Sequence, residues 1–158
     1  MSHLLGLNVD DTPTTNVSGF ALGTRCEDHR GYEYIYVHAN GAIDQYDFVV
    51  FDEAYEAYAL TAALAIDHPS GGAAQVAFAD NDYGWLLVRG VGSVNALTLC
   101  AAEVQLYSSG TEGHLDDADA SQSAVIGIRL SAAVGGGGAA SAACYLDHPK
   151  TVPAFDGA

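Results

Sequence analysis

The six histidines and three cysteines of this chain are the residues that could build a metal site. Cys26-Glu27-Asp28-His29 places a thiol and an imidazole three positions apart, whereas His68 and His148 each lie in an Asp-His-Pro segment. A zinc site needs four ligands that converge, and the chain lacks paired motifs such as C-x-x-C. We therefore predict no metal and no cofactor, and we interpret these histidines as solvated loop residues.

Two further patterns could serve ion binding or catalysis. Asp80-Asn81-Asp82-Tyr83-Gly84 is similar to the start of a calcium loop, but the downstream bidentate Glu is missing. Ser70 or Ser93 could be combined with a His and an Asp into a hydrolase triad, yet no G-x-S-x-G elbow is present. We interpret Asp116, Asp117 and Asp119 as a solvated acidic turn. The sequence thus predicts no catalytic residues and a protein that is not an enzyme.

Tyrosine is unusually frequent, with nine residues in the chain. Tyrosine and tryptophan are enriched at subunit interfaces, a carbohydrate platform would use the same ring faces, and half-buried strand positions would also account for them. The residue types alone do not rank the sugar platform against the protein interface. Our candidates for an interface with a partner or with another subunit are Leu4, Leu5, Leu7, Val9, Tyr34, Tyr36, Tyr83 and Trp85.

The charge balance is strongly acidic. The chain has 20 Asp and Glu but only five Lys and Arg, which gives a formal net charge of -15. Nucleic-acid binding and binding to an anionic membrane both need clustered cations, so we expect neither partner. The three cysteines are an odd number without close spacing, which argues for folding in a reducing cytosol. Leu4-Leu5-Gly6-Leu7 is too short for a signal peptide, and no apolar run is long enough to span a membrane.

The sequence predicts that short strands position these residues. Ala74–Gly90 predicts a hairpin: a strand over Gln75–Ala79, a turn at Asp80-Asn81-Asp82, and a second strand from Tyr83 to Val88. Alternation over Tyr32–His38 predicts another strand, which ends near the turn dipeptide Asn40-Gly41. Residues 52–66 are open between a helix and a hairpin. We favour the hairpin, followed by a short helical turn over Thr61–Ile66.

The remaining pattern completes an all-β reading. Val91–Val94 is interpreted as a turn, Glu103–Tyr107 and Ala124–Leu130 as strands, and Ser141–Leu146 as a last edge strand. Short strands at roughly ten-residue spacing predict a small single-domain β-barrel or sandwich of antiparallel strands with at most a short helix. We expect an extended N-terminal arm over residues 1–18, a β-rich core over 19–131, and a Gly/Ala-rich connector and tail over 132–158 that packs on the core or a partner.

The order of several short phrases resembles the capsid decoration, or cement, proteins of tailed bacteriophages. Leu22-Gly23-Thr24-Arg25 opens a Tyr-rich strand that ends near Asn40-Gly41-Ala42-Ile43. Gln45–Asp52, Gln75–Ala79 and Tyr83-Gly84-Trp85 come next. Ala102–Tyr107 then leads to Gly113-His114-Leu115-Asp116-Asp117 and to Ile126-Gly127-Ile128. The resemblance covers about residues 19–131.

This resemblance implies a non-enzymatic virion protein, made in the host cytoplasm, that binds the outer capsid surface. Its partner would be the major capsid protein, whose neighbouring subunits it would staple together, often as a homotrimer. Many copies at symmetry-related sites would make a modest single contact collectively strong. The alternative is a carbohydrate-binding or host-attachment module on a virion surface, and a small metal-dependent enzyme is the least favoured hypothesis.

Overall fold

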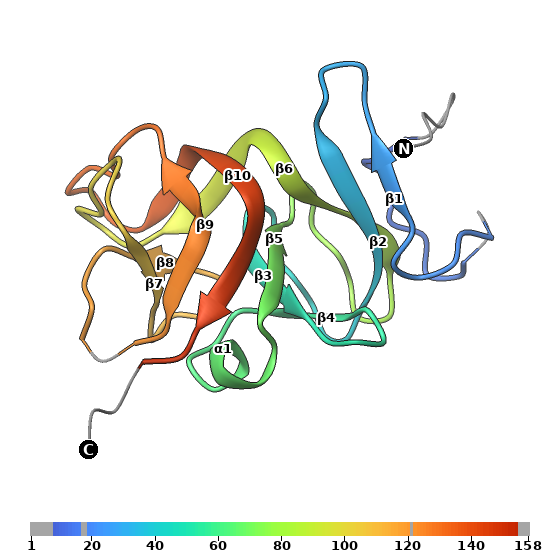
Figure 1. The fold of residues 1–158 in the computed structure, drawn as a ribbon, viewed down its shortest axis with the longest axis horizontal. Helices are drawn as coiled ribbons and strands as arrows, with labels where there is room; N and C mark the ends of the chain where they lie inside the picture. The colour runs from blue at the N-terminus through green and yellow to red at the C-terminus, as the bar shows by residue number, and fades with distance from the viewer. Residues whose placement is uncertain (1–7, 17–18, 121, 155–158) are drawn as a thin grey trace.

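The computed structural model describes residues 8–16, 19–120 and 122–154. Within these residues ten strands form a single sheet, and one short helix lies beside it (Figure 1). The fold is therefore all-β, as the strand spacing predicts. In chain order the elements are β1 (Arg25–Glu27), β2 (Glu33–Ala39), β3 (Phe48–Phe51), β4 (Glu56–Ala59), α1 (Leu64–Asp67), β5 (Ser70–Ala73), β6 (Tyr83–Ala96), β7 (Leu106–Ser108), β8 (Leu115–Asp116), β9 (Ala124–Leu130) and β10 (Ala140–Val152).

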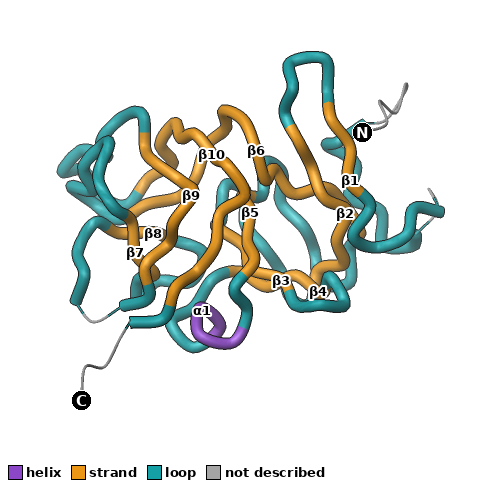
Figure 2. The backbone as a smooth tube through the Cα atoms, in the orientation of Figure 1, coloured by secondary structure: helices purple, strands orange, loops and turns teal. Residues whose placement is uncertain are grey.

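The strand pairings close into two rings that share β6. One ring runs β2, β4, β3, β5, β6 and back to β2; the other runs β6, β10, β9, β7, β8 and back to β6. All pairs are antiparallel except β2–β4 and β6–β8. Figure 2 shows strands wrapping around both halves of the molecule. Ring closure leaves few free sheet edges, which limits edge-to-edge association.

The length of β6 allows it to serve both rings. Residues 83–89 pair with β2, and residues 89–96 pair with β10. Gly90 lies at the junction with φ +124°, and a Cβ at this position would meet the ring of Tyr32. A residue without a side chain is required there, because both the backbone conformation and the close approach exclude a Cβ.

The core consists of two clusters of buried side chains: the smaller fills the first ring, and the larger covers the outer side of β2 and continues into the second ring. Trp85 belongs to the larger cluster, where its ring packs 4.9 Å from that of Tyr36 and 5.4 Å from that of Phe20. Phe48, Leu106 and Leu146 are among the side chains fully removed from solvent. Burial of each large apolar side chain contributes about 1.5–3 kcal/mol, so this aromatic and aliphatic core is the main source of stability.

The predicted hairpin over Ala74–Gly90 is wrong in its first half. Gln75–Ala79 does not form a strand, and Phe78 alone makes a bridge, to Ile43. The Gln75 side chain instead exchanges hydrogen bonds with the Ser93 backbone, at 3.0 and 3.1 Å. A side-chain amide thus takes the place of a neighbouring strand. The turn that follows is present, with Asn81 at φ 69°, a conformation that Asn tolerates.

Residues 52–66 form the favoured hairpin. β3 and β4 pair antiparallel, with Val50 opposite Tyr58, and α1 follows as a single short turn of helix. Asp52 Oδ1 accepts hydrogen bonds from the backbone N–H groups of Ala54 and Glu56, at 2.9 and 3.0 Å. This side chain holds the turn closed and explains why an Ala- and Glu-rich stretch folds back as strand.

Two predictions on the C-terminal side need correction. Val91–Val94 is not a turn, because it lies inside β6. Ser141–Leu146 is not an edge strand: it belongs to β10, which pairs with β6 on one side and β9 on the other. The chain after residue 131 therefore contributes an interior strand of the sheet. The sequence signal of this strand is weakened at its start by Ala140, Ala142 and Ala143, because alanine has low β-propensity.

The described part of the N-terminal arm lies on the chain's own core. The Tyr83 N–H donates to the Pro13 carbonyl at 2.8 Å, and Val9 packs against the larger core cluster. Residues 8–16 thus cover part of β2 and β6.

Candidate binding face

The predicted interface residues do not gather on one surface. Leu4, Leu5 and Leu7 lie outside the described residues. Tyr34, Tyr36 and Trp85 are 5%, 2% and 3% exposed, so the structure corrects their assignment to an interface. Val9 and Tyr83 are half-buried. The alternation in β2 is real, but both faces of this strand are covered, one by the ring interior and the other by Phe20 and the arm.

The outer surface of β6, β10 and β9 is the strongest candidate for partner binding. We call it the three-strand face; its outward residues are Arg89, Val91, Ile126, Arg129, Tyr145, Asp147, Lys150 and Val152. Val91, Tyr145 and Arg129 stand in one row across the three strands, because Tyr145 pairs with both of the others. Residues directly opposite each other in a sheet point to the same side. Figure 1 shows β9 and β10 side by side at the front of the molecule.

Large apolar side chains are exposed on the three-strand face. Val91, Tyr145 and Ile126 are 52%, 49% and 45% exposed although their inward neighbours are buried. Alternation fixes this outward direction, because Cys144 and Leu146 on either side of Tyr145 fill the second ring. Exposed apolar groups clustered on adjacent strands are typical of a surface that binds a partner.

Three of the chain's five cations lie on the same face. Arg89, Arg129 and Lys150 are exposed, and within the described residues none of them has an ion pair or side-chain hydrogen bond. Tyrosine and arginine are the residue types most enriched at binding hot spots. In a chain of net charge -15 this grouping makes the three-strand face electrostatically distinct from the remaining surface. Residue composition missed it, because only the strand register places these residues together.

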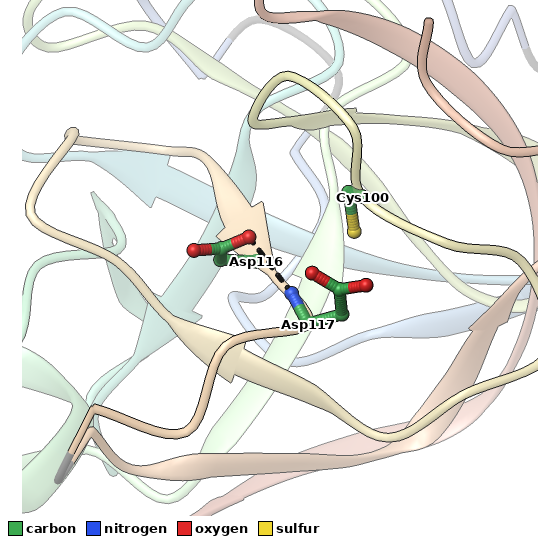
Figure 3. Close-up of side chains that lie close together, drawn as sticks. All are labelled: Cys100, Asp116 and Asp117. Atoms are coloured by element: carbon green, nitrogen blue, oxygen red, sulfur yellow. Dashed lines mark hydrogen bonds between the residues drawn. The ribbon is translucent and has the colours of Figure 1, made fainter.

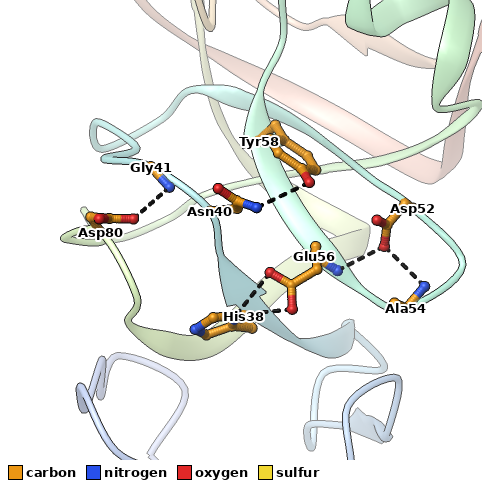
Figure 4. A network of polar contacts seen from close by, with 8 residues as sticks. All are labelled: His38, Asn40, Gly41, Asp52, Ala54, Glu56, Tyr58 and Asp80. Atoms are coloured by element: carbon orange, nitrogen blue, oxygen red, sulfur yellow. Dashed lines mark hydrogen bonds and ion pairs between the residues drawn. The ribbon is translucent and has the colours of Figure 1, made fainter.

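A polar network lies on the outer side of β2 and β4 (Figure 4). Nδ1 of His38 lies 3.0 and 2.9 Å from the two carboxylate oxygens of Glu56, and the His38 ring packs 4.5 Å from that of Tyr83. Asn40 Nδ2 donates to the Tyr58 hydroxyl at 3.1 Å, and the Tyr58 ring stacks on His68 at 5.3 Å. Parallel pairing of β2 and β4 sets His38 opposite Glu56. The network ties the two strands together and leaves ring edges at the surface.

Cys100, Asp116 and Asp117 form a second cluster, with potential ligand atoms within 4.8 Å of one another (Figure 3). Burial, together with the nearby Asp117 and Asp116 carboxylates, raises the pKa of the Cys100 thiol to about 11. The thiol is therefore protonated at neutral pH, whereas metal binding needs a thiolate. Asp117 Oδ2 accepts the Ala101 N–H at 2.9 Å, and Asp116 Oδ1 accepts the Asp117 N–H. Asp117 thus ties the segment after β8 to the loop after β6, and the expectation of no metal stays a prediction.

Comparisons with known proteins leave the family open. No protein-family model matches the chain, and no match is found among curated proteins. In the described part of the chain, no helix combines the length and apolar character needed to cross a bilayer.

Proposed function

We propose that this chain is a structural binding protein that decorates the outer surface of a phage capsid and stabilises contacts between major capsid subunits. The observation that carries the proposal is the three-strand face, where exposed Val91, Tyr145 and Ile126 lie beside unpaired arginines. The resemblance of the ordered sequence phrases to decoration proteins supplies the identity of the partner.

The face suits attachment to a protein surface. Rigid sheet strands hold its side chains, so little conformational entropy is lost when Tyr145 becomes buried. Arg129, next to Tyr145, is placed to pair with a carboxylate of the partner, and arginine offers two parallel hydrogen bonds in such a contact. The cations also steer this acidic protein so that the three-strand face meets an acidic partner first.

Repetition would strengthen a contact of modest area. We include the expected homotrimer in the proposal, because three linked copies bind neighbouring lattice sites at high effective concentration. The two closed rings keep each copy rigid, with few exposed strand edges that could pair in the wrong place.

Purified protein added to undecorated capsids tests the proposal. We expect binding at fixed stoichiometry in co-sedimentation, and a higher capsid melting temperature. Tyr145→Ala combined with Arg129→Glu should abolish binding, whereas Ile66→Ala, which removes an even more exposed apolar group on α1, should leave it unchanged. Wild-type protein that fails to sediment with any capsid would overturn the function, and equal loss in both variants would overturn the role of the face.

A virion-surface module that binds carbohydrate is the second candidate. The stacked Tyr58–His68 pair and the tilted His38–Tyr83 pair favour it, because sugar rings pack on aromatic faces beside polar groups such as the Glu56 carboxylate. Tyr58→Ala would then weaken binding on a glycan array without affecting capsid binding. A capsid-bound protein that shows no glycan binding removes this candidate.

A further inference from the structure

A groove beside the three-strand face is lined by both Asp-His-Pro segments of the chain. His68 and Pro69 precede β5, whereas His148 and Pro149 lie within β10. The two segments come together because Ser70 pairs with Lys150, and because the Thr151 N–H donates to the Pro69 carbonyl at 2.9 Å. Two segments separated by eighty residues in the sequence thus form one wall of a single groove.

The groove has two hollows that share Arg25, Phe51 and Ser70. The larger, of about 330 Å³, lies between the loop after β3 and the end of α1, and it includes Asp52, Glu53 and Asp67. The smaller, of about 60 Å³, includes His148 and Lys150. One end is therefore acidic and the other basic, with an aromatic floor between them.

The carboxylates of the larger hollow are available to a ligand. Glu53 and Asp67 are exposed and have no partner within the described residues. Asp52, which also lines this hollow, uses Oδ1 to cap its turn, and its Oδ2 has no hydrogen bond within the described residues. The Tyr55 ring stacks on Phe51 at 6.0 Å and adds an aromatic wall. Carboxylates beside an aromatic face suit a guanidinium or ammonium group, which gains both ion pairing and cation–π attraction.

The basic end is built around a buried carboxylate. Glu33, with a side chain only 5% exposed, accepts hydrogen bonds from Arg25 Nη1 at 2.9 Å and His148 Nε2 at 3.1 Å. His148 reaches Glu33 because β10 is irregular between Leu146 and Lys150 and because His148 has φ 51°. Such irregularities re-aim side chains next to functional sites. Arg25 pairs with Glu33, so among the described residues that line the groove Lys150 is the cation without a partner.

We propose that this groove binds a dipolar peptide segment, with a guanidinium or ammonium in the acidic hollow and a carboxylate beside Lys150. The inference deepens the proposed function by giving the chemistry of a partner segment, and it rests on that function only for the identity of the partner. An extended segment suits a groove that runs along β5 and β10, and the three carboxylates set its direction.

A titration with two matched probes tests the groove without capsids. N-acetyl-arginine carries a guanidinium and a carboxylate, whereas N-acetyl-arginine amide carries only the guanidinium. Followed by amide chemical shifts, N-acetyl-arginine should perturb residues 52–55, 67–70 and 148–150 at millimolar concentration, and the amide should bind about two- to five-fold more weakly. Equal affinities, perturbations elsewhere or no binding would overturn the proposal.

Variants of exposed residues separate the two ends. Lys150→Gln should lower the affinity for N-acetyl-arginine to that for the amide, and it should leave the affinity for the amide unchanged. Glu53→Gln with Asp67→Asn should weaken both probes, and the unperturbed remainder of the spectrum reports that the fold is intact. An unchanged probe affinity in either variant contradicts the assigned end. If the protein binds the probes but not capsids, the groove proposal stands and the proposed function is wrong. If it binds capsids but not the probes, the proposed function stands and the groove proposal is wrong.

Discussion

Glu33 and His148, separated by 115 positions in the chain, meet through a 3.1 Å contact between a buried carboxylate oxygen of Glu33 and Nε2 of His148. The contact joins β2 of the first ring to β10 of the second. Arg25 donates to the other Glu33 oxygen, so one carboxylate holds three strands together. We expect Glu33→Gln to lower the free energy of unfolding by about 1–3 kcal/mol, because a charged acceptor of two hydrogen bonds is lost. Urea denaturation measures this change. Glu53→Gln, at an exposed position, should change stability by less than about 0.5 kcal/mol.

The same carboxylate makes stability depend on pH in the acid range. Glu33 is desolvated by burial, which opposes the shift, but hydrogen bonds from Arg25 and His148 lower its pKa below the usual 4.5. A group whose pKa is lower in the folded state stabilises the fold above its unfolded pKa. This stabilisation is lost as the pH falls through the folded pKa. Unfolding of the wild type should therefore become easier below about pH 4.5, and Glu33→Gln should show a smaller change over that range. Parallel curves for the two proteins between pH 6 and pH 3 would contradict this assignment.

The turn before β8 depends on a glycine. Gly113 has φ +72°, and a Cβ there would overlap the Asp47 carboxylate. Gly113→Ala should destabilise the protein by at least about 1–2 kcal/mol, because it combines left-handed strain with this overlap. Gly110→Ala is the matched control, since a Cβ at residue 110 meets nothing within 4 Å. Thermal unfolding of both variants checks the prediction, and similar melting temperatures would refute it.

The three cysteines should be unreactive in the folded protein. Cys26, Cys100 and Cys144 are all buried, and burial is the largest cause that raises their pKa to about 11, 11 and 12. Thiol reagents attack the thiolate, which is scarce and shielded here at neutral pH. Ellman's reagent should therefore detect almost no thiol in native protein and three thiols in denaturant. Rapid labelling of the native protein would show that at least one of these sites opens.

Much of the fold follows from local pattern. Tyr32–His38 predicts β2 because aromatic and β-branched residues alternate, and Ala124–Leu130 predicts β9 with its full bounds. The hairpin of β3 and β4 follows from the run over Phe48–Phe51 and the turn residues Asp52-Glu53. Local pattern failed where non-local contacts decided the outcome. Gln75–Ala79 has the alternation of a strand. It does not pair as one, because the Gln75 side chain, rather than the backbone of this segment, bonds to the Ser93 backbone in β6.

The candidate site could not be predicted to the same degree. Tyrosine content indicated an interface, yet Tyr34 and Tyr36 are buried in the larger core cluster, whereas Tyr145 is exposed on a strand that the sequence predicts only as an edge strand. Burial depends on which faces the ring encloses, and a single strand's sequence does not contain that information.

Composition and periodicity by themselves determined that the chain is acidic, all-β and turn-rich, because charge, strand alternation and turn residues are local properties. Only the tertiary structure decided that β6 belongs to two rings, that Arg89, Arg129 and Lys150 share a face, and that His68 and His148 line one groove. Strand order and register set these relationships, since hydrogen-bonded pairing brings distant segments into contact irrespective of their separation in the chain.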